Sequence, residues 1–254
     1  MENKVALVTG AARGIGLATT HLFIELGWQV AMIDRDSAEL RNACRDIANA
    51  KAFECDVSIP EQVDLMIDEV LTEFGQIDAV VNNAGVADFL PIHETDFSTW
   101  RRIMETNLDG TFLVSQAAIP ALKQTKGAIV NIGSISGLRA STLRVAYGTS
   151  KAAVIHMTKQ QAIELGDFGV RANCVCPGPV KTKLAMAVHS PEIISAYLDA
   201  MPLGRYGSER EIAEVIAFLC SDKASYVTGQ VIAADGGFET AGVGLPALRK
   251  AAEE

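Results

Sequence analysis

The chain has 254 residues, of which 49% are hydrophobic and 21% charged, a balance typical of a soluble globular protein. Its formal net charge of −9 argues against a nucleic-acid partner. No apolar run is long enough for a membrane span, and the start carries no signal-peptide pattern, so we expect a cytoplasmic protein with no membrane partner. The five cysteines include no C-x-x-C pair, so neither a disulfide nor a metal site is expected.

Short apolar runs alternate along the chain with longer helical patterns. The expected strands cover residues 5–8, 30–33, 79–81, 128–132, 170–175 and 231–233, and the expected helices cover residues 14–26, 38–48, about 98–122 and 147–165. Continuous rather than alternating apolar strands indicate a sheet covered on both faces. The strand–helix order therefore predicts an α/β fold: a doubly wound, Rossmann-type parallel sheet with helices on both faces, in one domain over residues 1–254.

Two segments depart from this alternation. Residues 177–205 are rich in Pro, Lys, Thr, Ala and Met, and we expect helical pieces there that form a substrate lid over the carboxyl edge of the sheet. Residues 239–254 form a polar C-terminal tail that we expect to fray.

A glycine-rich turn follows the first expected strand and opens the first expected helix. Gly10, Gly14 and Gly16 follow the spacing G-x-x-x-G-x-G rather than G-x-G-x-x-G. At such a turn a pyrophosphate can meet unpaired backbone N–H groups and the positive helix end. Asp34 ends the second strand, where a carboxylate can bind an adenosine ribose and repel a 2′-phosphate. Arg13 and Arg35 could instead pair with that phosphate, but we give Asp34 more weight and predict NAD over NADP.

Tyr147 and Lys151 lie four residues apart, which places both on one face of a helix. A phenol is a poor proton acceptor near neutrality, and a nearby ammonium favours its ionised form by roughly 4 kcal/mol at an intermediate dielectric. The pair can therefore act as a general acid and base.

With these features the chain closely resembles the short-chain dehydrogenase/reductase family over about residues 4–238. The resemblance rests on separate motifs in a fixed order: the turn at residues 9–16, Asp56-Val57, Asn82-Asn83-Ala84-Gly85, the set Asn107, Ser134, Tyr147 and Lys151, Pro177-Gly178-Pro179-Val180-Lys181-Thr182, Gly229-Gln230, and Asp235-Gly236-Gly237.

The resemblance implies a catalytic set of four residues. Tyr147 would exchange a proton with the substrate oxygen, while Lys151 would favour the ionised phenol and hold the nicotinamide ribose. Ser134 would orient the substrate oxygen, and Asn107 would anchor a water that links Lys151 to solvent. The implied cofactor contacts are Gly10, Arg13, Gly14, Ile15, Gly16, Asp34, Arg35, Asp56, Val57, Asn83, Gly85, Tyr147, Lys151, Val180 and Thr182.

The implied activity is an NAD-dependent oxidoreductase that transfers a hydride between the nicotinamide and a small secondary alcohol, polyol or sugar and its ketone, without a metal. One alternative is a 3-oxoacyl-carrier-protein reductase. Its usual NADPH is opposed by Asp34, and Thr125 and Phe168 stand where carrier reductases place basic residues. A nucleotide-binding regulator without turnover is a third reading, which the intact catalytic set opposes.

Substrate contacts carry weaker signals. The candidates are His93, Ser136, Arg144 and His189, and Arg144, three residues before Tyr147, would favour a polyol, sugar or anionic substrate. The helix with Tyr147 is apolar around much of its circumference, so one face can cover the sheet and another a partner subunit. We therefore predict a homotetramer.

Overall fold

The computed structural model describes residues 4–241, apart from the side chains of residues 184, 185 and 187. Seven strands, all paired in parallel, form one sheet in the order β3-β2-β1-β4-β5-β6-β7. They are β1 Val5–Thr9, β2 Gln29–Asp34, β3 Ala50–Glu54, β4 Ala79–Asn82, β5 Ala128–Ile132, β6 Arg171–Pro177 and β7 Val231–Ala234. The chain winds outward from β1 in both directions, as predicted for a doubly wound sheet.

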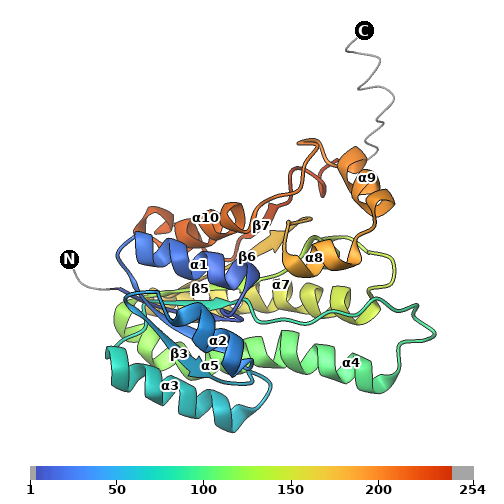
Figure 1. Cartoon of the computed structure of the whole chain (residues 1–254). Helices are drawn as coiled ribbons and strands as arrows, with labels where there is room; N and C mark the ends of the chain where they lie inside the picture. The colour runs from blue at the N-terminus through green and yellow to red at the C-terminus, as the bar shows by residue number, and fades with distance from the viewer. Residues whose placement is uncertain (1–3, 242–254) are drawn as a thin grey trace.

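Helices connect the strands and cover the sheet (Figure 1). They are α1 Gly14–Glu25, α2 Ser37–Cys44, α3 Pro60–Phe74, α4 Phe97–Met104, α5 Gly110–Thr125, α6 Ile135–Leu138, α7 Val145–Leu165, α8 Lys183–Val188, α9 Pro191–Ala200 and α10 Glu209–Cys220, with a π-helical turn η1 Glu105–Asp109 and 3₁₀ turns η2 Gly166–Phe168 and η3 Asp222–Ala224.

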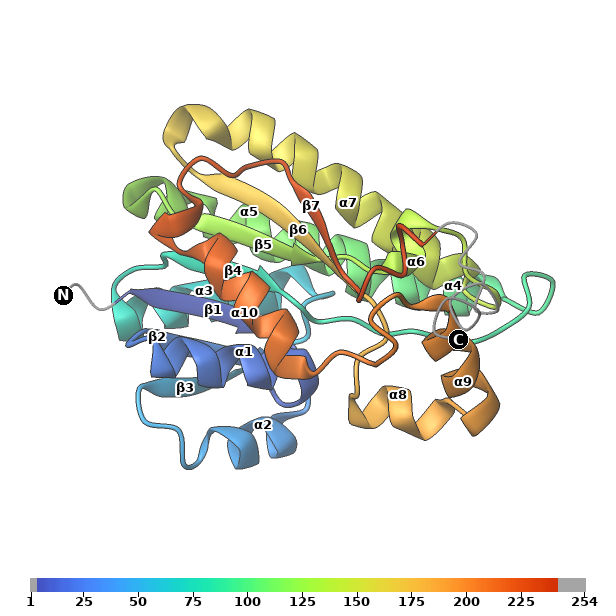
Figure 2. The same cartoon turned by 90° about the horizontal axis from the view of Figure 1, so that it is seen from above.

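The two faces of the sheet pack against different helices. In β1, Ala6 and Val8 join a buried cluster with Phe23 of α1 and residues of α10, whereas Leu7 joins a second cluster with Val114 of α5 and residues of α3. Figure 2 shows α1 and α10 side by side over one face. All residues of β1, β4 and β5 are buried, which explains why these strands read as continuous apolar runs.

The sequence patterns missed β3, α3 and α10. In β3, an edge strand, only Phe53 is buried, and Lys51 and Glu54 face solvent, so the apolar signal is weak. The helix expected near residues 98–122 is present, but it is interrupted by the π turn η1, which contains Asn107. Such turns are rare and occur frequently at functional sites.

The predicted helical pieces within residues 177–205 are α8 and α9, which lie beyond the carboxyl edge of the sheet (Figures 1 and 2). Both ends of this segment are paired to each other. Val180 forms a parallel bridge with Gly207, and the Gly207 N–H donates to the Pro179 carbonyl at 3.0 Å. The predicted C-terminal tail lies outside the described residues from residue 242 onward.

All five cysteines are free thiols. Cys174 and Cys176 point to the same side of β6, where their sulfur atoms are 3.9 Å apart. Within residues 4–241, no cluster of His, Cys, Asp and Glu could hold a metal ion. In the same range, no helix combines the length and the apolar character needed to cross a membrane.

Candidate active site

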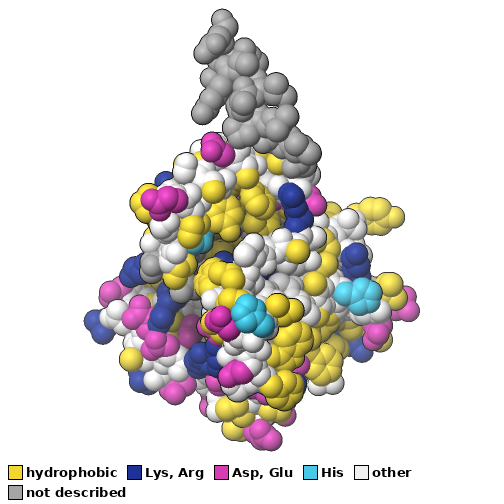
Figure 3. Space-filling view, turned by 90° about the vertical axis from the view of Figure 1, so that its right-hand side faces the viewer, with side chains coloured by type: hydrophobic (Ala, Val, Ile, Leu, Met, Phe, Trp, Pro, Cys, Tyr) yellow, Lys and Arg dark blue, Asp and Glu magenta, His cyan; other side chains and the backbone are white. Residues whose placement is uncertain are grey.

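A cleft of about 1310 Å³ runs along the carboxyl ends of the strands. Figure 3 looks onto this edge, where the surface is hollowed between apolar side chains. The cleft exceeds the usual ~300–1,000 Å³ of small-ligand pockets, so it has room for a dinucleotide together with a substrate. Almost all predicted site residues line it. The exceptions are Gly16, His93 and Asn107.

The glycine turn between β1 and α1 forms one end of the cleft. Gly10 and Gly14 have φ values of +65° and +61°, which disfavour other residues. A Cβ on Gly16 would lie 2.2 Å from the Gly10 carbonyl oxygen, so Gly16 lets the helix start close to the turn. The Asn83 amide donates to the carbonyls of Thr9 at 2.9 Å and Gly10 at 3.1 Å, which fastens the turn to the end of β4.

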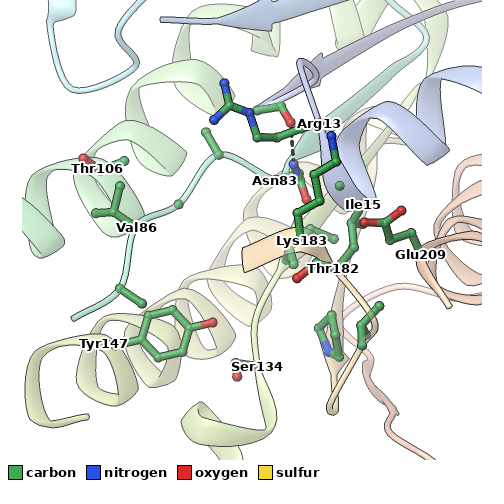
Figure 4. A pocket seen from close by; sticks show the side chains of 18 of the residues that line it. Arg13, Ile15, Asn83, Val86, Thr106, Ser134, Tyr147, Thr182, Lys183 and Glu209 are labelled. Carbon is green, nitrogen blue, oxygen red and sulfur yellow. Dashed lines mark hydrogen bonds between the residues drawn. The ribbon is translucent and has the colours of Figure 1, made fainter. Parts of the chain in front are cut away.

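The start of α1 is free to bind an anion. Its N-cap residue, Arg13, makes no side-chain cap hydrogen bond, so the first N–H groups of the helix have no side-chain acceptor. Ile15 lies beside them at the cleft (Figure 4). An uncapped helix start beside a glycine turn fits the pyrophosphate of a nicotinamide dinucleotide.

Asp34 stands at the end of β2, where its carboxylate accepts from the N–H groups of Ala12 at 3.2 Å and Asp36 at 3.0 Å. Both predicted competitors for a phosphate are already paired, because Arg13 forms an ion pair with Asp36 and Arg35 lies 3.5 Å from Asp56. This end of the cleft therefore offers a fixed carboxylate and no unpaired guanidinium among the described residues.

Asp56 and Val57 follow β3 at the same end. Burial raises the pKa of Asp56, but hydrogen bonds from Ser58 and the charge of Arg35 outweigh it, and the net pKa is lowered. Asp56 is therefore ionised at neutral pH. Val57 is 6% exposed and packs where a side chain on Gly110 would lie, so α5 holds it in place.

Ser134, Tyr147 and Lys151 line the cleft at its other end. Ser134 follows β5 as the N-cap of α6 and accepts from the Ser136 N–H at 3.0 Å. Tyr147 and Lys151 lie one turn apart on α7, and the Tyr147 hydroxyl points toward the side of Ser134 (Figure 4). Lys151 is 4% exposed, and its ammonium donates to the Ile132 carbonyl at 2.7 Å and lies 5.9 Å from the Tyr147 ring centre.

Asn107 is fully buried behind Gly85 rather than in the cleft. Its amide exchanges hydrogen bonds with the Val86 backbone at 2.8 and 2.9 Å and donates to Ser150 at 3.0 Å. A Cβ on Gly85 would lie 3.3 Å from the Asn107 side-chain oxygen and 3.5 Å from the Lys151 nitrogen. Asn107 therefore fixes the loop after β4, and its role in a water-linked proton relay stays a prediction.

The four predicted substrate contacts separate into two groups. Ser136, Arg144 and His189 line the cleft. His93 does not: its side chain is 77% exposed and lies 3.5 Å from Glu94, because the loop after β4 carries it outward. Burial, and secondarily the charge of Arg144, lower the pKa of His189, so this ring is neutral at pH 7.

Some lining residues gave no signal in the sequence. Phe89, Tyr197 and Glu209 come from three separate elements, and no spacing relates them to the motifs. Lys183 is the exception, because it directly follows Thr182 at the end of the 177–182 motif and also lines the cleft (Figure 4).

Comparisons with known proteins agree with this architecture. The profile of a family described as enoyl-(acyl carrier protein) reductase matches residues 10–239. A 2-(S)-hydroxypropyl-CoM dehydrogenase from Xanthobacter autotrophicus is 38% identical, over 93% of this chain and 97% of the relative. A 3-oxoacyl-(acyl-carrier-protein) reductase from Thermotoga maritima is 38% identical, over 93% and 98% of the two chains.

Two further comparisons cover almost the whole chain. A meso-2,3-butanediol dehydrogenase from Serratia marcescens is 38% identical, over 97% of this chain and 98% of the relative. The crystal structure of gox2181 superposes with a TM-score of 0.91 at 33% identity, over 94% and 97% of the two chains. The relatives are oxidoreductases of CH–OH groups, and their family uses NAD(H) or NADP(H). The protein belongs to the short-chain dehydrogenase/reductase family.

Proposed function

We propose that this protein is an NAD-dependent oxidoreductase that interconverts a small secondary alcohol, polyol or sugar and its ketone. One observation carries the proposal: Ser134, Tyr147 and Lys151 line the same cleft as the glycine turn at the start of α1. The nicotinamide, when bound, supplies or accepts the hydride. The chain itself supplies orientation and proton transfer.

Three side chains carry the proton and the orientation. Ser134 donates to the substrate oxygen and holds the carbonyl carbon toward the nicotinamide position. Tyr147 gives a proton to that oxygen during reduction and takes it back during oxidation. Lys151, buried and without a carboxylate partner among residues 4–241, places a positive charge 5.9 Å from the Tyr147 ring centre, at the reaction end of the cleft. Val180 and Thr182, which line the cleft, would hold the nicotinamide amide.

The preference for NAD is supported by the end of β2. Each Asp34 oxygen accepts one backbone hydrogen bond and keeps a lone pair for a ribose hydroxyl. A 2′-phosphate at this position would face a carboxylate, and it would have to separate Arg13 or Arg35 from an acidic partner. Both effects disfavour NADP.

The second candidate is a 3-oxoacyl-carrier-protein reductase, which the Thermotoga maritima relative favours. An acidic carrier requires a basic docking surface. Thr125 donates to the Ile77 carbonyl at 2.8 Å and Phe168 is an uncharged ring, so neither residue supplies a positive charge at these two positions. The small-alcohol reading is therefore preferred.

A panel experiment tests the proposal. The purified protein is mixed with NAD or NADP and a series of secondary alcohols, diols and sugars, and NADH or NADPH formation is followed by absorbance. In parallel, acetoacetyl-carrier protein is offered with NADH and NADPH. We expect turnover of one or more small alcohols with NAD at higher kcat/KM than with NADP. Efficient reduction of the carrier substrate with NADPH alone would establish the second candidate instead.

A homotetramer is part of the same proposal. Apolar side chains remain exposed along α5, α7 and η2, with Phe112 at 48%, Ile163 at 77% and Phe168 at 46%. A second copy could cover them. Sedimentation equilibrium is expected to give four times the chain mass, and a mass near the 27.0 kDa of one chain would refute this assignment.

A further inference from the structure

The two ends of the cleft differ in charge. The end beside β2 and β3 is lined by the four carboxylates of Asp34, Asp36, Glu39 and Asp56 and by two guanidinium groups, which are paired with Asp36 and Asp56. The other end surrounds Tyr147, and among the described residues that line it there is no carboxylate and a single guanidinium, Arg144. Its lining includes Phe89, Ser136, Arg144, Tyr147, His189 and Tyr197, and the Lys151 ammonium lies at its base, where it donates to the Ile132 carbonyl. The net charge of the chain is −9, so positive charge in this pocket must come from the residues that line it.

Arg144 is held in place by its backbone. It pairs with Leu90 in a parallel bridge, and its carbonyl accepts from the Gly148 N–H at 2.7 Å at the start of α7. The guanidinium carbon lies 4.0 Å from the Phe89 ring centre and 5.1 Å from the Tyr147 ring centre. Aromatic rings thus contact the flat guanidinium group, a favourable cation–π arrangement.

The donors of Arg144 have no protein partner. A guanidinium has five N–H groups in a planar fork, directed outward from its edges. Within residues 4–241, no carboxylate or carbonyl accepts from Arg144, in contrast to Arg102 and Arg210 outside the cleft, which form ion pairs. The ring contacts use none of these N–H groups as donors to a protein oxygen, so the donors are left for a ligand.

His189 lies on the lid side of the same pocket. Its Nδ1 is 3.0 Å from the Tyr206 hydroxyl, and its ring stacks on Tyr197 at 5.3 Å between centres. The positive charge of Arg144 reaches this ring and helps to lower its pKa. His189 is therefore a neutral polar side chain of the pocket. Of the two cations there, Lys151 already donates to the Ile132 carbonyl, and Arg144 is the one whose N–H donors have no acceptor among the described residues.

We propose that the substrate of this enzyme carries a carboxylate only a few bonds from the reacting carbon and that Arg144 binds this group through paired N–H donors. The inference rests on the proposed oxidoreductase function and narrows its substrate to short hydroxy acids and oxo acids. A carboxylate matches the guanidinium fork in bidentate geometry, which a hydroxyl cannot do. Because the guanidinium contacts the Tyr147 ring, a short substrate can reach both groups at once.

Matched substrates test the inference. 2-Hydroxy and 3-hydroxy acids, such as 3-hydroxybutyrate, are compared with their neutral amides, such as 3-hydroxybutyramide, by kcat/KM with NAD. We expect at least one acid to exceed its amide by about 30-fold or more, the range of a charged hydrogen-bonded contact. In Arg144→Met the acid-to-amide ratio should fall by about 100-fold, and Arg144→Lys should restore part of it because it keeps the charge.

Two controls keep the test specific. Arg102→Met removes a guanidinium that pairs with Asp88 outside the cleft, so the acid-to-amide ratio should not change. Malonate should inhibit oxidation of the best substrate competitively in the wild-type protein but not in Arg144→Met, and malonamide should inhibit neither. NAD titration and a melting curve establish that each variant is folded.

The outcomes separate this inference from the function beneath it. An unchanged acid-to-amide ratio in Arg144→Met, or a wild-type preference for the amides, overturns the anionic substrate and leaves the oxidoreductase intact. Turnover of neutral alcohols without turnover of any hydroxy acid does the same. If no alcohol of either class reduces NAD, the proposed function fails and this inference fails with it.

Discussion

The glycine turn and the lid border the same cleft, and different interactions hold them in place. At the glycine turn, the Gly16 backbone packs directly against the Gly10 carbonyl. The Asn83 side-chain amide donates hydrogen bonds to the carbonyls of Thr9 and Gly10. No side chain could be added at Gly16 without moving the main chain. The cofactor end is therefore rigid and tolerates little change.

Few backbone hydrogen bonds fix the lid. Residues 179–181 pair with Gly207 at its two ends, Arg205 bonds Glu211 at the start of α10, and the Leu203 N–H donates to the Gly236 carbonyl at 3.1 Å. Side chains make the other contacts, including the Tyr197 ring, which lies 5.7 Å from the Phe238 ring. Such a segment can vary its lining residues while the cofactor end stays the same, which separates specificity from cofactor binding.

The largest expected effect is a loss of turnover in Tyr147→Phe while NAD binding is retained. Tyr147→Phe deletes one hydroxyl at the reaction end of the cleft, so kcat should fall by at least about 1,000-fold. The dissociation constant for NAD, measured by fluorescence titration with NADH as competitor, should change less than about threefold, because the turn and Asp34 are untouched. A loss of NAD affinity comparable with the loss of turnover would contradict the separation of the two ends.

The next effect removes cofactor binding. In Gly16→Ala, the added Cβ would lie 2.2 Å from the Gly10 oxygen, so the turn must shift. The dissociation constants for NAD and NADP should both rise by about 100-fold, with a cost in stability of about 1–3 kcal/mol from overpacking. Gly166→Ala is the matched control, because nothing lies within 4 Å of its Cβ and its φ of −57° suits any residue. Equal cofactor affinity in both variants would refute the rigid turn.

A smaller effect alters cofactor choice alone. Asp34→Asn keeps an acceptor for the Ala12 N–H but removes the charge that would repel a 2′-phosphate. The ratio of kcat/KM with NAD to that with NADP should fall by about 10- to 100-fold, while the preference among alcohols stays the same. Asp46→Asn, on the exposed chain after α2, should change neither. A ratio unaffected by Asp34→Asn would mean that the ion pairs of Arg13 and Arg35 decide the cofactor.

The contrast between the ends also explains what the sequence could predict. The cofactor end is local: Gly10, Gly14, Gly16 and Asp34 lie within one β–α–β segment, so their spacing alone predicted where they meet. Tyr147 and Lys151 are also local, because they lie one turn apart on α7, whereas Ser134 was predicted from the family resemblance and not from its spacing. The central strands were predicted from the sequence because all their residues are buried, which makes each strand a continuous apolar run.

The rest depends on contacts between distant segments. His93 and Arg144 looked equivalent as candidate substrate contacts, yet only Arg144 is brought to the cleft, through its bridge with Leu90. The sequence also did not predict that Arg13 pairs with Asp36 and Arg35 with Asp56. Without these partners, an arginine beside Asp34 is a candidate phosphate ligand. The edge strand β3 gave no apolar run because only Phe53 is buried.

The smallest expected effect concerns the base of the lid. Hydrogen bonds from Arg205, and then from Ser208, lower the pKa of Glu211 to about 2. A carboxyl whose pKa is depressed by folding contributes stability above its unfolded pKa of ~4.3, and that stability is lost as the pH falls toward the folded value. Glu211→Gln should therefore lower the melting temperature by a few degrees at pH 7, and the difference from wild type should vanish between about pH 4 and pH 2.

Thermal melts of both proteins across this range measure the effect, and Glu214→Gln serves as the control, because Glu214 pairs with Arg210 one turn further along α10 without capping the helix. The control difference should be smaller at every pH. Since Glu211 holds the far end of the lid, Glu211→Gln should also raise KM for the alcohol more than KM for NAD. A melting difference that persists at pH 2, or a larger change for NAD than for the alcohol, would mean that this ion pair does not anchor the lid.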